Sequence, residues 1–143
     1  ITALAVCLVA TPLVALSDDD INDLQTKIKS VEVRERREAA RTLSQIGDNA
    51  APALSALIKA LDDKDEQVIA HALAAITQLG PNAQAAVPRL IDNLKNKNAQ
   101  VRFRSAYALG QVGPEAVDGF RKVLEAMMDP DMRRHFNALK DPE

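Results

Sequence analysis

Residues 66–81 read EQVIAHALAAITQLGP and residues 99–114 read AQVRFRSAYALGQVGP, so one pattern occurs twice in the chain. Gly47, Gly80 and Gly113 are evenly spaced, which defines a 33-residue period, and an apolar residue precedes each glycine. Four positions before each glycine is a large aliphatic side chain, and eight before it is a small one: Leu43, Ile76 and Leu109, then Ala39, Ala72 and Ser105. A fixed period of this length indicates tandem helical repeats that stack on one another.

Within each unit, the apolar spacing is that of two short amphipathic helices. We expect the first helix over residues 33–46, 66–79 and 99–112, and the second over 50–61, 83–95 and 116–128. Asp65 and Asn98 stand where an N-cap is needed, and Asp131 occupies the same place one period later. Each glycine lies just past a first helix, where left-handed backbone ends it. Pro88 is expected to separate a short leading turn from the second helix.

The period divides the chain into an apolar leader, residues 1–17, and a repeat domain, residues 18–143. The domain comprises a half repeat at 21–30, repeats at about 31–63, 64–96 and 97–129, and a terminal half repeat at 130–143. Ile21, Leu24 and Ile28 match the second-helix positions of a preceding unit. The end of the chain carries polar residues typical of a terminal cap: Arg133, Arg134, Asn137 and Lys140.

The leader carries no charge, and Asp18, Asp19 and Asp20 follow it directly. It resembles the apolar core and cleavage region of a secretory signal. An uncleaved membrane anchor and a buried first helix are the alternatives, although the leader is shorter than the roughly 20 residues that span a bilayer. The leader lacks the 33-residue register, so we expect it to lie outside the repeat core. The protein is then periplasmic or secreted, or anchored to the membrane through residues 1–17.

Residues 100–117, QVRFRSAYALGQVGPEAV, resemble the HEAT repeats of the phycobilisome-lyase type. The same pattern is weaker in residues 67–87 and weaker again in residues 35–54, and the resemblance covers about residues 20–140. It implies an all-α fold, an armadillo-like right-handed α-α superhelix built from helical hairpins. The family includes chromophore-attachment subunits, a di-iron hydroxylase, DNA-repair proteins and adaptors, so the resemblance implies no single activity.

Catalytic chemistry is not expected. The two histidines, His71 and His135, are not followed by glutamate, so a carboxylate–histidine metal site has too few ligands. Cys7, the single cysteine, lies in the leader, and no glycine-rich phosphate loop opens a helix. We therefore expect no catalytic residue, no metal and no cofactor. The stretch Lys27–Arg41 has an excess of three positive charges, but its mixed signs are typical of a solvated helix face.

Repeats place equivalent side chains in rows, and rows can form binding surfaces. On the second helices one row is Ala56, Arg89 and Lys122, and another is Lys59, Asp92 and Glu125. The aromatic residues Phe103, Tyr107 and Phe136 fall on the outward side of the first helices. They form either an apolar contact patch for a partner or a seal over the end of the array. A further row, Gln45, Gln78 and Gln111, could bond across repeats.

The sequence thus predicts a non-enzymatic scaffold or adaptor that binds another protein outside the cytoplasm. The alternatives are an accessory, lyase-like subunit or the arm of a larger enzyme, and then a nucleic-acid-binding solenoid. Nucleic acid is not the expected partner, because a formal net charge of -2 provides no long-range attraction to a polyanion. A membrane is a partner only if the leader is an uncleaved anchor.

Overall fold

The computed structural model describes residues 16–127, 130, 131 and 134, with the backbone alone for residues 122–124 and 126–127. These residues form helices joined by short turns, without a strand, as the sequence predicts. The elements in chain order are α1 (Asp18–Lys27), α2 (Val33–Gln45), η1 (Gly47–Ala53), α3 (Leu54–Ala60), α4 (Glu66–Leu79), η2 (Gly80–Ala86), α5 (Val87–Asn93), α6 (Ala99–Val112) and α7 (Pro114–Met127).

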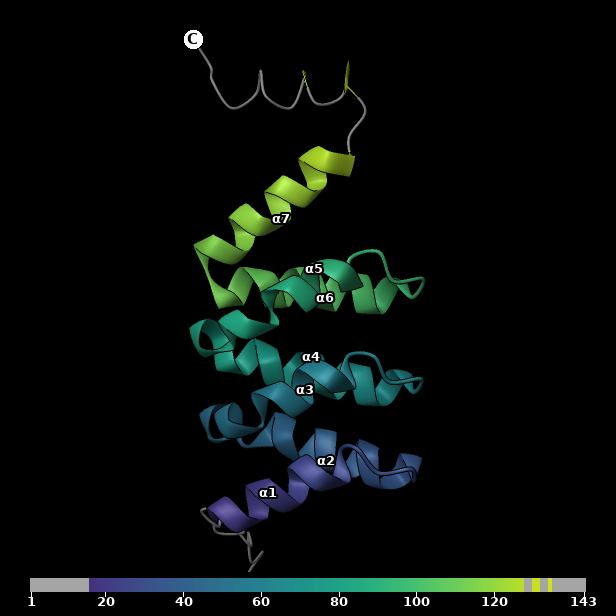
Figure 1. Ribbon diagram of the computed structural model, residues 1–143, viewed down its shortest axis with the longest axis vertical. Coiled ribbons are helices and arrows are strands. Elements are labelled where there is room, and N and C mark those ends of the chain that lie inside the picture. The colour runs from purple at the N-terminus through teal and green to yellow at the C-terminus, as the bar shows by residue number, and fades with distance from the viewer. Residues whose placement is uncertain (1–15, 128–129, 132–133, 135–143) are drawn as a thin grey trace, which may run out of the picture.

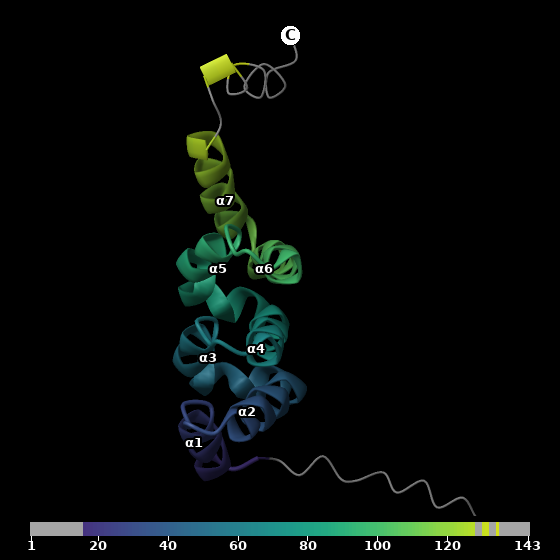
Figure 2. The same ribbon diagram turned by 90° about the vertical axis from the view of Figure 1, so that its right-hand side faces the viewer.

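The helices stack into an elongated solenoid (Figure 1). Turned by 90°, the molecule shows two columns, with α2, α4 and α6 in one and α1, α3 and α5 in the other (Figure 2). We call these the first-helix column and the second-helix column. Within the first-helix column each helix packs on the next, α2 on α4 and α4 on α6. Equivalent positions of successive repeats therefore lie side by side along the column.

The first helices form where the 33-residue period predicts them. The side chain of Asp65 accepts hydrogen bonds from the amides of Gln67 and Val68, and that of Asn98 accepts one from Gln100, so both are N-caps. At the other end, Gly47, Gly80 and Gly113 have φ of 57°, 49° and 130°. A Cβ strains the backbone in this region, which is why glycine recurs at this point of each unit.

The second helices differ among the units. In the first two, a 3-10 turn containing Pro52 or Pro81 leads into a short α-helix, and Pro88 stands in the first turn of α5. In the third unit, Pro114 opens a single 14-residue helix, α7, because no proline follows it inside that helix. Asp131 departs from its expected N-cap role: its own backbone is helical, and its carboxylate lies 3.6 Å from Arg134.

The core is built from aliphatic and small side chains between the two columns. Leu43, Ile76 and Leu109, four positions before each glycine, are buried, as the register requires. The small residues eight before the glycine are buried as well: Ala39, Ala72 and Ser105. Small side chains at these positions let adjacent helices of the first-helix column approach closely. A single hairpin could not bury these faces, so the stacking itself creates the core.

The half repeat at the start of the described chain is α1. Ile21 and Ile28 are buried against the core and Leu24 packs beside them. Ser17, the last residue of the expected leader, is the N-cap of this helix and forms a capping box with Asp20. Leu16, also within the expected leader, is partly buried and packs against the core, so this residue does not lie outside the repeat core as expected. Residues 1–15 lie outside the described residues.

Candidate binding surface

The charged residues predicted on the second helices lie in the second-helix column and on α7. Arg89 on α5 forms ion pairs with Asp62, in the turn after α3, and with Asp92 at 3.5 Å. Ala56, which shares its row, is buried, whereas Lys59 on α3 is exposed. Arg89 therefore joins two repeats, and its charge is already neutralised by carboxylates of its own chain.

Lys122 and Glu125 both lie on α7. The structure gives only the backbone of Lys122, and Glu125 is half-buried and has an interaction partner. These two positions continue the rows of Arg89 and Asp92 in the third unit. They form no open charged row together with Arg89, because Arg89 is held by Asp62 and Asp92.

The aromatic residues on α6 point into solvent. Phe103 is 70% exposed and Tyr107 is 57% exposed, one turn apart on the same side of the helix. The 33-residue period predicts this outward orientation, and the structure confirms it. Phe136, the third member of the predicted cluster, lies outside the described residues. Two large rings on one exposed helix face are a feature of contact surfaces, where aromatic residues are enriched.

The aromatics belong to a larger surface, which we call the first-helix face. It consists of four equivalent outward positions on each first helix. On α2 these positions hold Arg34, Arg37, Glu38 and Arg41; on α4 they hold Gln67, Ala70, His71 and Ala74; on α6 they hold Gln100, Phe103, Arg104 and Tyr107. The face thus carries three arginines on α2, two alanines on α4 and two aromatic rings on α6.

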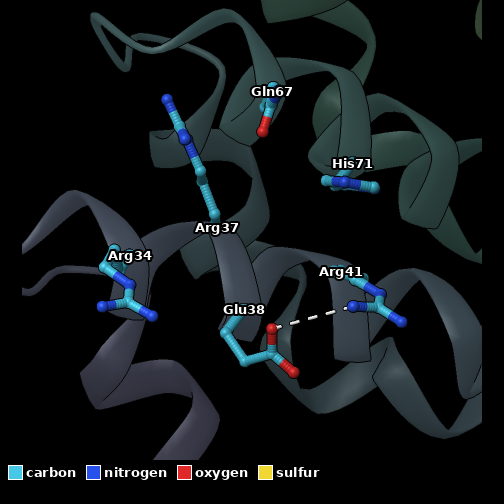
Figure 3. Close-up of a pocket in the computed structure, with 6 residues that line it drawn as sticks. All are labelled: Arg34, Arg37, Glu38, Arg41, Gln67 and His71. Carbon is cyan, nitrogen blue, oxygen red and sulfur yellow. Dashed lines mark ion pairs between the residues drawn. The ribbon is translucent and has the colours of Figure 1, made fainter.

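A hollow of about 260 Å³ lies on this face between α2 and α4 (Figure 3). Its lining comprises Arg34, Arg37, Glu38, Arg41, Gln67 and His71. Arg37 extends from α2 toward the turn before α4 (Figure 3), where its Nε and Nη2 donate to the carboxylate of Asp65 at 2.9 and 2.5 Å. The charge of Arg37 is therefore paired with a carboxylate of the same chain. Arg34, in contrast, lies at the edge of the hollow and forms no ion pair with the described residues.

Arg41 lies on the other side of the same hollow. Its Nη1 is 3.9 Å from Oε2 of Glu38, one turn earlier on α2, and both side chains are mostly exposed. A contact of this length between exposed groups is worth little, on the order of 0.5 kcal/mol or less. Arg41 can therefore turn to an incoming anion at small cost.

A second hollow continues the face between α4 and α6. It is lined by Leu73, Ala74, Thr77, Gln78, Arg104 and Tyr107, and a further one beside it by Glu66, Gln67, Ala70, Asn98, Gln100, Val101 and Arg104. Gln67 borders hollows on both sides of α4, and Arg104 borders both hollows between α4 and α6. The hollows therefore form one interrupted groove that runs across the three first helices.

Two acidic residues next to this face are held by arginines. Asp65 accepts hydrogen bonds from Arg37, Gln67 and Val68, and the Arg37 guanidinium lowers the pKa of Asp65 to about 2. Burial alone would raise the pKa of Asp63, but hydrogen bonds from Arg36 and from the Asp65 amide lower it below its usual range. Both carboxylates therefore remain ionised and fix the turn between the first two repeats.

Sequence reasoning missed the grouping of Arg34, Arg41 and His71 in one hollow. The mixed charges of the stretch Lys27–Arg41 predict a solvated face, and the structure shows that the members of this stretch have different roles. Lys27 pairs with Asp23 at 2.6 Å, and Arg36 and Arg37 pair across the repeat boundary. The 33-residue register could have identified the hollow, because it aligns Glu38, His71 and Arg104 in one row.

The residues that the structure describes contain no helix long and apolar enough to cross a membrane. Within the same residues, no three His, Cys, Asp or Glu side chains come together as a metal site would require.

The two columns of helical hairpins define the class: this is an α-solenoid of tandem repeats. The sequence pattern of HEAT repeats matches residues 54–140, and the chain therefore belongs to the HEAT-repeat family. The pattern of the PBS lyase HEAT-like repeat matches residues 35–63, which cover most of α2 and all of α3. The two patterns together span the three repeats and agree with the resemblance found in residues 100–117.

Two individual proteins show more limited likeness. The crystal structure of an engineered protein aligns with a TM-score of 0.59 and 24% identity, over 72% of this chain and 50% of that one, and shows the fold alone. The HTH-type transcriptional regulator PetP of Rhodobacter capsulatus is 74% identical over 27 residues. That stretch is 19% of this chain and 16% of the regulator, so most of the regulator has no counterpart in the match.

Proposed function

We propose that this protein is a non-enzymatic scaffold or adaptor that binds another protein through its first-helix face. The observation that carries the proposal is the exposure of Phe103 and Tyr107, on one side of α6 and beside the groove. Leaving the two rings largely in water forgoes part of the roughly 1.5–3 kcal/mol that full burial of a large apolar side chain contributes. A bound partner would recover that stabilisation by covering both rings.

The hollows of the face support protein binding over small-molecule chemistry. Their volumes of about 260 and 240 Å³ are below the roughly 300–1,000 Å³ typical of drug-sized ligand pockets, and they open along the surface. The side chains around them form a broad, interrupted contact area over three helices. Such an area fits a macromolecular partner.

The experiment is capture of a partner by the full chain, followed by surface variants. The double substitution Phe103→Ser and Tyr107→Ser should abolish recovery of the partner, because it removes both rings. Val31→Ser is the matched control, since Val31 is an apolar residue 93% exposed in the turn before α2. Circular dichroism must first show that both variants keep their helices. Equal recovery with the double variant and the wild type would contradict the proposal.

An accessory subunit or arm of a larger enzyme is the second candidate, favoured by the PBS lyase HEAT-like pattern over residues 35–63. It predicts turnover only when the captured partner is present, whereas a scaffold predicts none. We assign no catalytic residue, metal or cofactor to this chain. A single-residue substitution that abolishes turnover by the purified chain would refute the scaffold proposal.

We propose further that the protein acts outside the cytoplasm, on the strength of the uncharged residues 1–17 followed by three aspartates. Intact mass of the exported product tests this. An exported chain that has lost the leader supports the proposal, while a cytoplasmic chain that retains Cys7 contradicts it.

A further inference from the structure

Resting on the binding function proposed above, we infer that the first-helix face binds an acidic peptide segment of its partner. Carboxylates of the segment contact Arg34 and Arg41 on α2, and an apolar side chain of the same segment packs on Phe103 and Tyr107 of α6. The groove across α4 lies between these two ends.

The cationic end is open to a ligand because Arg34 and Arg41 form no close ion pair within the described residues. Arg36 and Arg37 are fixed by Asp63 and Asp65, with N–O distances between 2.5 and 3.1 Å. Arg34 has no ion pair within the described residues, and Arg41 has only the 3.9 Å contact with Glu38. Guanidinium groups bind carboxylates through paired N–H donors, so an acidic side chain is the matching ligand group.

The middle of the face leaves room for a peptide close to α4. Ala70 and Ala74 occupy the α4 positions that hold Arg37 and Arg41 on α2 and Phe103 and Tyr107 on α6. Both alanines are partly exposed, and each lines a hollow between α4 and α6. With longer side chains on either side, these small residues form the floor of the groove.

The aromatic end supplies an apolar contact next to one further cation. The hollow between α4 and α6 presents Leu73, Ala74 and Tyr107, with Arg104 at its edge. Arg104 makes no ion pair within the described residues, so it can bind another carboxylate beside the apolar side chain. Neighbouring packed helices are roughly 8–10 Å apart, so the distance from α2 to α6 is about 16–20 Å. About five or six extended residues span it at roughly 3.3 Å each.

The distribution of charge favours a peptide over nucleic acid. A nucleic acid backbone carries a phosphate at every nucleotide and is bound through runs of neutralising cations. Here the free cations stand at the two ends of the face, separated by Ala70 and Ala74, so they do not form a continuous run. Carboxylates alternating with apolar side chains match this spacing.

The test uses the full chain immobilised against a random short-peptide library, followed by synthesis of the most enriched peptide. We expect enrichment of Asp and Glu together with Leu, Phe or another apolar residue. Binding of that peptide should weaken with added salt, and the double variant Arg34→Glu and Arg41→Glu should weaken it about five-fold or more. The control is Lys29→Glu with Lys95→Glu, which makes the same change in net charge at exposed lysines in the turns after α1 and α5.

Each other outcome overturns the inference. The inference is wrong if the library yields no enriched peptide, or peptides without acidic residues, or if both double variants bind the selected peptide equally well. A single-stranded oligonucleotide that binds more tightly than the peptide and displaces it would assign the face to nucleic acid. Loss of whole-partner capture on Phe103→Ser and Tyr107→Ser would in these cases still support the proposed binding function, so the two failures are distinguishable.

Discussion

Asp65 both caps a helix and pairs with an arginine, whereas the equivalent residue of the next repeat only caps its helix. Its carboxylate caps α4 and also receives the Arg37 guanidinium from the preceding helix. One repeat later, Asn98 keeps the capping role, while Ala70 replaces the arginine. The same change occurs at a second pair of positions. Asp63 pairs with Arg36, and one repeat later these two positions hold Asn96 and Ile69. The boundary between the first two repeats therefore has carboxylates paired with guanidinium groups. The next boundary has amides at the same positions, and no arginine stands at the partner positions.

We predict that Asp65→Asn destabilises the protein by about 1 kcal/mol at neutral pH while α4 stays capped. Asn98 shows that an amide caps this position in the same fold, so the loss reports the ion pair with Arg37. The measurement is a urea titration, with circular dichroism reporting the helices. An unchanged free energy of unfolding would mean that the pair contributes nothing.

The same variant has a distinctive pH dependence. The folded-state pKa of Asp65 is about 2, below its ordinary value of 3.8. Its contribution is therefore complete above about pH 5 and is lost as the pH falls through 3.8 toward 2. The difference in unfolding free energy between wild type and Asp65→Asn should shrink over that window. A difference that stays constant down to pH 2 would show that ionisation of Asp65 does not stabilise the fold.

Core positions in the register should be far more sensitive than exposed ones. Ile76→Ala and Leu109→Ala should each cost about 2–5 kcal/mol, because both side chains are buried between the columns. Gln45→Ala on the exposed side of α2 should stay within about 0.5 kcal/mol. Equal effects of the core and surface changes in a urea titration would mean that the register is wrong.

Gln78 is a poor surface control, although it stands in the same row as Gln45. Its Nε2 donates a hydrogen bond to the Ser44 carbonyl at 2.8 Å, from α4 back to the end of α2. Bonding across repeats, which the glutamine row suggests, is therefore observed at this position. Removing the bond by Gln78→Ala should cost about 1 kcal/mol in a urea titration. A cost as small as that of Gln45→Ala would show that the bond adds no stability.

At the scale of the helices, glycine marks where a first helix ends. Gly80 has φ 49°, which a side chain strains, whereas Gly110 lies inside α6 and an added Cβ there would meet nothing within 4 Å. Gly80→Ala should therefore destabilise the protein by about 1–3 kcal/mol. Gly110→Ala should stabilise it by about 0.5 kcal/mol, because alanine favours helix. Thermal unfolding of the two variants measures both, and shifts of the same sign would contradict the assignment.

The elements that could be predicted from sequence are those fixed by local chemistry. The apolar period and the caps located the first helices, with only residue 46 falling outside α2. The second helices were harder, because the position of one proline decides between a 3-10 turn followed by a helix and the continuous α7. The N-cap expected at Asp131 was wrong for a related reason, since the period alone does not fix the backbone of a single residue.

At the scale of the whole molecule, stacking brings together residues that lie one full period apart in the sequence. The outward position of Phe103 and Tyr107 followed from the period. The pairing of Arg89 with Asp62 did not, because it depends on how far a long side chain reaches into the neighbouring turn. For the same reason, the two open arginines of the hollow could be identified only from the structure, which shows Arg36 and Arg37 with their partners.

The central claim is that the first-helix face is the binding surface, and site-specific photo-cross-linking tests it most directly. A benzophenone amino acid placed at Tyr107 in the full chain should give one cross-linked product of higher mass with the native partner. The same amino acid at Val31, which is exposed in the turn before α2, should give none. A cross-link at Val31 with none at Tyr107 would contradict the claim.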